Sequence, residues 1–362
     1  MSRWRVAIIG CGNIGRAHAR AWLKIPERVE LAAITDSNQE ALDEAGAAWG
    51  VAEEHRYLDF RALLDQEHPD IVSICSWHGQ HAPMTIAAAA RKPKAILCEK
   101  PMATSLREAD EMIIAAQRNG VKLAIGHMRR FLPSWDEARQ LIADGAIGRP
   151  ERLWSSVSDG LLNWSTHTVD AMRFLLGDPA AQWVVGSVQR ETDRFERNLR
   201  IEDSCLGLIQ FAGKGAGPGP QASIQMDLGA ERHWQVVGTE GIIEARTARV
   251  RVLTSEGGGW RELDGARMTS QDAFNAQAVA MADWVDGVTK GYRSEAANAR
   301  ATLELLFAVY ESARLHEVTR LPLRTLENPL NLMVESGQLP VLRPGRYDLR
   351  SNLVRGEAMR WE

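Results

Sequence analysis

The chain has 362 residues, of which 45% are hydrophobic and 25% charged, and its formal net charge is −4. This length exceeds one typical domain, so we expect two domains of an ordinary globular protein. The interspersed charges argue against nucleic acid as a partner, and no apolar run is long enough to predict a membrane-spanning helix. The four cysteines share no C-x-x-C spacing, which argues against a zinc site or redox pair. Together with an N-terminus that leaves no room for a signal peptide, this favours a cytoplasmic protein.

The strongest local pattern lies in residues 6–16. The apolar residues 6–9 predict a buried strand, and a helical segment begins at Arg16. Three glycines lie between them: Gly10, Gly12 and Gly15. In a G-x-G-x-x-G motif these glycines allow a tight turn, close approach to a pyrophosphate, and packing of the helix on the strand. A second apolar run ends at Asp36, where a carboxylate would meet ribose hydroxyls. We predict a dinucleotide site; the alternative is an ordinary turn with an unrelated acid.

Strands and helices then alternate as far as residue 126. We expect helices at 38–50, 59–67, 82–90 and 106–118, and strands at 70–74, 95–98 and 121–125. Alternation of this kind predicts a parallel sheet with helices on both faces. Because ligands bind at the carboxyl ends of such strands, four loops should line one crevice: 10–15, 36–37, 75–81 and 99–101.

The pattern changes after residue 131 to longer, alternating segments. We expect strands at 151–158, 182–190, 203–211, 222–228, 234–238 and 242–253, and helices at 134–144, 165–176, 273–288 and 295–315. Glycine-rich connections at 213–220 and 257–259 predict hairpins, so the sheet should be mostly antiparallel. We interpret 213–220 as a hairpin tip rather than a site, and we expect residues 322–362 to be irregular.

Two positions offer acid–base chemistry. Lys100 follows the strand 95–98, so its amine should point into the predicted crevice and donate to a substrate oxygen; the alternative is a solvated loop lysine. If 164–176 is a helix, Asn163 and His167 share one face, and Asp170 lies one turn beyond. A histidine can take a proton from an alcohol, although a structural role is the alternative. For Asp170 we favour a structural role.

Taken together, these motifs resemble those of the Gfo/Idh/MocA family, named after glucose–fructose oxidoreductase, inositol dehydrogenase and a rhizopine-catabolism protein. The resemblance extends to about residue 322 and includes Cys75 to His81, Glu99-Lys-Pro101, Gly126-His-Met-Arg-Arg-Phe131, Leu162 to Asp170, Glu202-Asp203 and Gly238-Thr-Glu-Gly241. It implies an α/β fold with an N-terminal Rossmann domain, residues 1–126, and a C-terminal α/β domain, residues 127–322, built on an open, mostly antiparallel sheet. Residues 323–362 would form a C-terminal extension. The outer face of that sheet commonly joins family members into homodimers or homotetramers.

The resemblance also implies the roles of individual residues. Lys100 and His167 match the catalytic pair, with exchangeable roles, and a cis bond seen in some relatives would fall at Lys100–Pro101. Substrate-binding positions are Asn163, Arg129 and Trp164. Cofactor-binding positions are Gly10, Gly12, Asn13, Ile14, Gly15, Asp36, Ser37, Ser76, Trp77, His81, Glu99 and Lys100. No metal is expected. Asn163 replaces the family's usual Asp; it can hydrogen-bond a hydroxyl but cannot take its proton.

The implied activity is hydride transfer between nicotinamide and a secondary hydroxyl of a sugar, inositol or related polyol. Asp36 favours NAD because a carboxylate repels the 2′-phosphate of NADP, although Ser37 beside it leaves NADP open. One alternative is an NAD-dependent glycosidase of the same family, which would form no net NADH. Another is a sugar-sensing regulator without catalysis, against which the retained Lys100 and His167 argue. The sequence does not name the sugar.

Overall fold

The computed structural model describes residues 3–157, 160–213, 217–226, 233–246, 249–263 and 269–348. Parts of some expected segments therefore lie outside the described residues: 158, 214–216, 227–228, 247–248 and 349–362. Contacts within the chain divide it into two compact units. The first contains Met1–Met128 and Gln271–Arg300, and the second contains Arg129–Ser270 and Ala301–Asp348.

The first unit is built on a six-stranded parallel sheet with the strand order β3-β2-β1-β4-β5-β6. The strands are β1 (Trp4–Ile9), β2 (Val29–Thr35), β3 (Arg56–Tyr57), β4 (Ile71–Ile74), β5 (Ala95–Cys98) and β6 (Lys122–Ile125). Every residue of β4 and β5 is buried, as expected of strands covered on both faces. This confirms the predicted Rossmann-type architecture.

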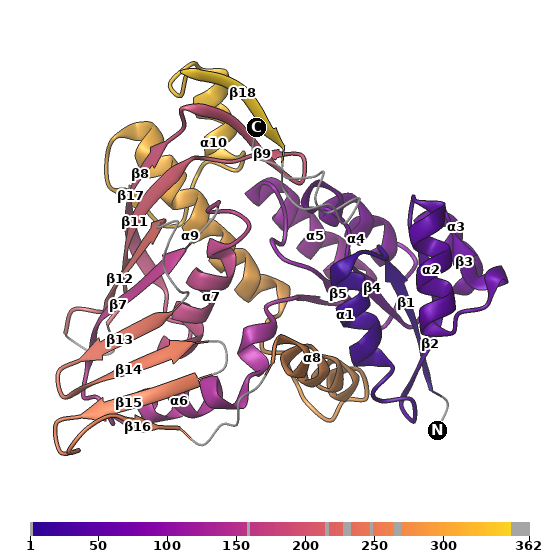
Figure 1. Ribbon diagram of the computed structural model, residues 1–362, viewed down its shortest axis with the longest axis horizontal. Helices are drawn as coiled ribbons and strands as arrows, with labels where there is room; N and C mark the ends of the chain where they lie inside the picture. Colours follow the sequence, from indigo (N-terminus) through magenta and orange to yellow (C-terminus); the bar gives the residue numbers. More distant parts are fainter. Residues whose placement is uncertain are drawn as a thin grey trace. The chain divides into compact units, whose positions relative to one another are not determined.

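The helices of the first unit, labelled in Figure 1, begin and end as follows. They are α1 (Asn13–Trp22), α2 (Gln39–Trp49), α3 (Phe60–Glu67), α4 (His81–Ala89), α5 (Leu106–Asn119) and, from late in the sequence, α8 (Ser270–Val285). Side-chain oxygens of Asn38, Asp59 and Ser105 accept hydrogen bonds from the first turns of α2, α3 and α5. Gly50 and Gly120 end α2 and α5 in the left-handed region.

The second unit is built on a nine-stranded sheet with the order β16-β15-β14-β13-β7-β12-β11-β8-β17. All neighbouring strands are antiparallel except β7 and β12, which confirms the predicted mostly antiparallel sheet. The strands are β7 (Pro150–Val157), β8 (Ala181–Gln189), β11 (Ser204–Phe211), β12 (Gln221–Met226), β13 (Trp234–Gly238), β14 (Gly241–Arg246), β15 (Arg249–Thr254), β16 (Arg261–Glu262) and β17 (Thr319–Arg320).

Helices α6 (Pro133–Ala143), α7 (Ser165–Leu176) and α9 (Ala296–Leu315) lie on one side of this sheet (Figure 1). Gly186 and Gly207 pair across β8 and β11, where α9 approaches closely. A Cβ at Gly186 would lie 2.2 Å from the carbonyl oxygen of Val309 in α9, so the helix can pack there only against glycine. The opposite face of the sheet leaves apolar side chains exposed, among them Trp154, Val185 and Leu206.

The C-terminal segment is more regular than its composition suggests. Helix α10 (Pro329–Glu335) begins with proline and is capped by Asn328, and β18 (Arg343–Asp348) is a strand. β18 pairs in parallel with β9 (Thr192–Glu196), which also pairs with β10 (Leu199–Arg200). The expectation of irregular structure was therefore wrong for these parts, because a pairing with a strand about 150 residues earlier leaves no local signal. No helix among the described residues is long and apolar enough to cross a membrane.

Candidate functional site

The glycine loop between β1 and α1 leaves open space in front of the helix. Gly10 has φ +102°, and a Cβ there would lie 2.7 Å from the carbonyl oxygen of Cys75. A Cβ at Gly15 would lie 2.0 Å from the carbonyl oxygen of Gly10, but one at Gly12 would meet no atom within 4 Å. Gly12 precedes α1 without a side-chain cap, and the first turn contains no acidic residue. The loop therefore fits a pyrophosphate bound by main-chain N–H groups.

Asp36 lies directly after β2 and is half-buried. Its Oδ2 accepts a hydrogen bond from the N–H of Cys11 at 2.8 Å, and its Oδ1 accepts one from the N–H of Asn38 at 2.9 Å. These bonds fix the carboxylate beside the glycine loop, where the predicted ribose contact requires it. Ser37 and Asn13 are exposed on the same edge of the sheet, and Ile14 is half-buried in the first turn of α1.

The loops after β4 and β5 are joined by His81, the first residue of α4. Its Nδ1 lies 2.7 Å from the carbonyl oxygen of Pro101, and its Nε2 lies 3.0 Å from that of Ser76. The ring is fully buried, so His81 holds the two loops together. Trp77 and Ser76 are half-buried. The peptide bond Lys100–Pro101 is cis, as the resemblance implied.

Glu99 has a buried partner that the sequence did not reveal. His18 of α1 is 2% exposed, and its Nε2 lies 3.0 Å from Oε1 of Glu99, which is 4% exposed. The other carboxylate oxygen accepts from the N–H of Lys100 at 3.2 Å. The sequence does contain one signal for this pair. His18 is titratable and lies on the buried stripe of α1, between Gly15 and Trp22, where it needs a partner.

In the second unit, the residues around α7 differ in detail from the prediction. Helix α7 begins at Ser165, so Asn163 lies in the turn before it and does not share a helical face with His167. The Asn163 amide nitrogen donates to Oε1 of Glu196 in β9. His167 and Trp164 are half-buried at the start of the helix. The carboxylate beside Asn163 thus comes from a strand 33 positions later, which spacing along the chain could not show.

A second carboxylate, Glu202, lies against the same turn and is fully buried. It accepts from the N–H of Leu161 and, at 2.6 Å, from the hydroxyl of Tyr310. Burial raises the pKa of Glu202 above its ordinary value, and these hydrogen bonds offset only part of that effect.

The two arginines of the Gly126 to Phe131 motif have different surroundings. The guanidinium of Arg129 lies 5.0 Å from the centre of the Trp234 ring. Arg130 is paired with Asp170 at 2.8 Å and with Asp178 at 2.8 Å. Asp170 also accepts from the hydroxyl of Thr302 at 3.2 Å, and these contacts agree with the structural role that we favoured.

All four cysteines are free and buried. Burial, and to a smaller extent the charge of Asp36, raises the pKa of Cys11 to about 12. Burial also raises the pKa of Cys205 well above its ordinary value. These thiols are therefore packing groups rather than nucleophiles at neutral pH.

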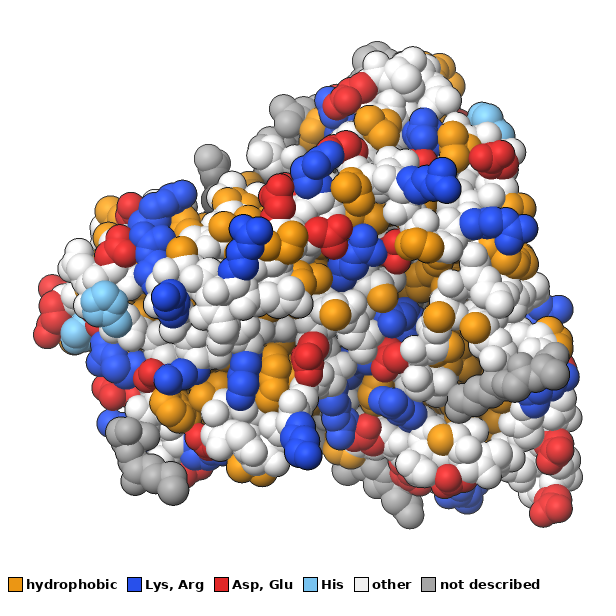
Figure 2. Space-filling model, turned by 180° about the vertical axis from the view of Figure 1, so that it is seen from behind, with side chains coloured by type: hydrophobic (Ala, Val, Ile, Leu, Met, Phe, Trp, Pro, Cys, Tyr) orange, Lys and Arg blue, Asp and Glu red, His pale blue; other side chains and the backbone are white. Residues whose placement is uncertain are grey.

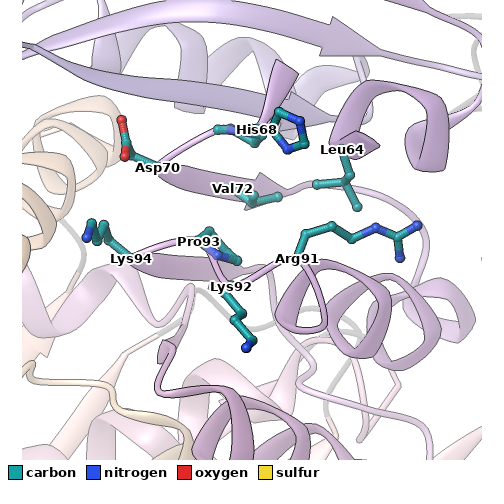
Figure 3. Close-up of a pocket in the computed structure, with 9 residues that line it drawn as sticks. Leu64, His68, Asp70, Val72, Arg91, Lys92, Pro93 and Lys94 are labelled. Atoms are coloured by element: carbon teal, nitrogen blue, oxygen red, sulfur yellow. The ribbon is translucent and has the colours of Figure 1, made fainter. Parts of the chain in front are cut away.

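One cavity of the first unit lies away from the glycine loop. Its volume is about 260 Å³, and most of its lining residues lie just before β4 and β5, at the amino ends of these strands (Figure 3). They are Leu64, His68, Pro69, Asp70, Val72, Arg91, Lys92, Pro93 and Lys94. Lys92 and Lys94 extend in different directions in Figure 3, so the cations do not converge on one point. Basic and acidic side chains are also interspersed over the face shown in Figure 2.

Comparison with known proteins agrees with this architecture. Residues 4–127 match the model described as oxidoreductase family, NAD-binding Rossmann fold, and residues 156–318 match its C-terminal alpha/beta domain. An uncharacterized oxidoreductase of Bacillus subtilis, YrbE, is 29% identical over 69% of this chain and 76% of its own. Myo-inositol 2-dehydrogenase of Thermotoga maritima is 29% identical over 70% of this chain and 79% of its own.

Among solved structures, levoglucosan dehydrogenase in complex with NADH and levoglucosan has a similar fold. The TM-score is 0.77 at 21% identity, and the match covers 89% of this chain and 100% of that one. Both halves of the chain thus match the two domains of one family in the same order. The chain belongs to the Gfo/Idh/MocA family of oxidoreductases, with an NAD-binding Rossmann domain followed by the family's C-terminal α/β domain.

Proposed function

We propose that this protein transfers a hydride between NAD and a secondary hydroxyl of a sugar, inositol or related polyol. The observation that carries the proposal is the glycine loop, where open space faces an uncapped helix N-terminus. The bound nicotinamide would supply the hydride chemistry, and the chain would supply binding, orientation and proton transfer.

In this proposal Lys100 donates a hydrogen bond to the reacting oxygen of the substrate. Its main chain is fixed by the Glu99 carboxylate and by the loop that His81 holds. His167 takes the hydroxyl proton, and its half-buried position lets the ring meet a substrate. Asn163, Arg129 and Trp164 contact the remaining hydroxyls and ring carbons of the substrate.

The choice of NAD over NADP rests on Asp36. Two main-chain N–H groups hold its carboxylate, so it cannot turn away from the ribose without losing both hydrogen bonds. A fixed negative charge there disfavours a 2′-phosphate. The remaining site residues, Gly10, Gly12, Asn13, Ile14, Gly15, Ser37, Ser76 and Trp77, would contact the cofactor around this anchor.

The substrate class follows from the family. The relatives compared above include an enzyme named for myo-inositol and a structure solved with levoglucosan, and both compounds carry secondary hydroxyls. Which polyol this chain prefers depends on a few hydrogen bonds to hydroxyl groups. The Asn163–Glu196 pair is one group of polar side chains able to make them.

The test is a screen of NAD and NADP reduction with inositols, aldoses, anhydrosugars and uronates. We expect NADH formation with at least one of these, abolished by Lys100→Ala and by His167→Ala. Full activity in both variants would contradict the catalytic assignment. Cleavage of an aryl glycoside without net NADH would identify the glycosidase, and NAD binding without turnover of any compound would favour the sensor.

A further inference from the structure

Behind Lys100 lies a continuous line of buried polar side chains that the proposed function leaves unused. The indole N–H of Trp22 donates to Oγ of Ser73 at 2.9 Å, and that oxygen lies 3.4 Å from Nδ1 of His18. His18 Nε2 then lies 3.0 Å from Oε1 of Glu99, and Oε2 accepts from the N–H of Lys100. The line therefore runs from α1 through β4 to the loop after β5, within one unit.

The Glu99 carboxylate lies against the main chain that follows β6. A Cβ at Gly126 would lie 2.2 Å from its Oε1, so the main chain after β6 is in contact with the carboxylate. On the helix side, the ring of Phe274 in α8 packs against the ring of His18, with centroids 5.4 Å apart. Both partners of the His18–Glu99 pair are thus confined by surrounding atoms.

This arrangement keeps a negative charge next to Lys100. Burial opposes ionisation of Glu99, but the hydrogen bond and charge of His18, together with Lys100, hold the pKa of Glu99 below its ordinary value. The electrostatic attraction is mutual, so the carboxylate also stabilises the ammonium form of Lys100. Without a donor at position 18, burial would favour the neutral acid.

Other groups near Glu99 stay uncharged. Burial raises the pKa of Cys75 and of Cys98 well above the usual value for a thiol, and it raises the pKa of Tyr292 likewise. The charge of Glu99 adds to each of these shifts. Among the described groups, His18 and Lys100 are the partners that lower the pKa of Glu99.

We propose that His18 is a positioning residue for Lys100: it holds the Glu99 carboxylate in place, and this carboxylate fixes the main chain of Lys100 and keeps its amine protonated. His18 acts through Glu99 and does not touch the substrate. The inference deepens the proposed function, since it matters for catalysis only if Lys100 takes part, but the charge of Lys100 can be measured without any substrate.

The experiment measures the pH at which Lys100 becomes reactive. The full chain, with and without NAD, is labelled with trace acetic anhydride across the pH range in which amines titrate, and acetylation of Lys100 is followed by peptide mass spectrometry. We expect Glu99→Gln to lower the midpoint by about 1 pH unit, because a neighbouring negative charge is lost. His18→Leu should act in the same direction, and His18→Gln, which keeps an N–H donor, should lie between His18→Leu and the wild type.

A matched control is available in the same unit. His55 Nδ1 lies 2.7 Å from Oε1 of Glu67, next to β3, and three strands separate β3 from β5. His55→Gln should leave the Lys100 midpoint unchanged. If an active substrate is found, the pH profile of kcat/KM should move with the labelling midpoint in each variant, and the affinity for NAD should change less than twofold in the two His18 variants.

The outcomes separate the two proposals. A Lys100 midpoint that is the same in the wild type, Glu99→Gln and His18→Leu would overturn the inference, whatever the enzyme does. Shifted midpoints in a protein that oxidises no polyol would support the inference and contradict the proposed function. If His18→Leu does not fold, Glu99→Gln and His18→Gln still decide the question.

Discussion

Arg130 lies almost fully buried between the carboxylates of Asp170 and Asp178. Its Nε donates to Asp170 at 2.8 Å and its Nη1 to Asp178 at 2.9 Å, so one guanidinium joins the motif after β6 to helix α7 and to the loop after that helix. The two carboxylates raise the pKa of Arg130 although burial acts against this. The group is therefore charged at every pH at which the protein is folded.

Replacing Arg130 by Met should be strongly destabilising. The buried Asp170 would lose its cation, and breaking one partner of a buried ion pair costs about 3–5 kcal/mol. Urea unfolding followed by circular dichroism measures the loss. Arg149→Ala breaks a pair with Glu151 in which both side chains are about half exposed, and should change the free energy of unfolding by less than about 1 kcal/mol. Equal effects of the two substitutions would contradict this account.

Glu67 makes the stability of the first unit depend on pH in the acidic range. Burial would raise the pKa of Glu67, but hydrogen bonds from Tyr57 and His55 and the charges of His55 and Arg5 lower it below the ordinary value. Because its pKa is lower in the folded state, ionised Glu67 stabilises the fold at pH values above its unfolded-state pKa of about 4.3. This stabilisation is lost as the pH falls through the folded-state pKa. The stability difference between the wild type and Glu67→Gln should thus shrink as the pH falls below about pH 4. A stability difference between the two proteins that does not change with pH would refute this account of Glu67.

The proposed preference for NAD over NADP rests on one side chain, Asp36. Asp36→Ala removes the negative charge and the acceptor for the Cys11 and Asn38 N–H groups. We expect weaker NAD binding and a ratio of NADP to NAD affinity at least tenfold higher than in the wild type, because the repulsion of the 2′-phosphate is gone. Isothermal titration with both cofactors measures the ratio. An unchanged ratio would mean that Asp36 does not face the ribose.

At the scale of elements, two glycines in the turn from β1 to α1 have different functions. Gly15 allows the helix to contact the strand, since a Cβ would lie 2.0 Å from the carbonyl oxygen of Gly10. Gly12 leaves open space in front of the helix. Its φ of −70° is accessible to any residue, so the fold itself does not require glycine there.

Gly12→Ala and Gly15→Ala should therefore act differently. Gly12→Ala should keep the melting temperature within about 2 °C of the wild type and weaken NAD binding at least tenfold, because the methyl group would occupy the space of the pyrophosphate. Gly15→Ala should lower the melting temperature by several degrees. Differential scanning fluorimetry with and without NAD measures both. Normal NAD affinity in Gly12→Ala would show that the phosphates bind elsewhere.

At the scale of the whole molecule, the open face of the nine-stranded sheet is the main unexplained surface. Trp154, Ser223, Leu208 and Val185 are neighbours across four adjacent strands, and Leu206 lies two residues from Leu208 on the same face. Leu206 is 53% exposed and Val185 39%. Apart from Ser223 these side chains are apolar, and a group of exposed apolar side chains on neighbouring strands indicates a protein interface. We propose that two copies of the chain associate through this face.

Leu206→Glu combined with Val185→Glu should then convert the oligomer to monomers, measured by sedimentation velocity at micromolar concentration. Two carboxylates per copy would have to be buried in the interface, which is strongly unfavourable. Val288→Glu is the control, since Val288 is 72% exposed in the other unit. A wild-type chain that sediments as a monomer would rule out this interface.

The sequence alone determined the features that local chemistry controls. The glycine spacing and the alternation of strands and helices act over a few residues, so their outcome could be predicted from the order of residues. The cis bond at Lys100–Pro101 came from the family motif. The mostly antiparallel sheet followed from alternating polarity and glycine-rich turns.

Only the tertiary structure decided which polar groups meet. His18 contacts Glu99 across 81 positions and Asn163 contacts Glu196 across 33, and β18 pairs with β9 from the far end of the chain. His18 lies on the buried stripe of α1, which is a local signal, but no local pattern marks which residue it meets or which residue Asn163 meets. The reason is physical: a buried charge or amide must find a hydrogen-bond partner, but which partner it finds depends on how the elements pack.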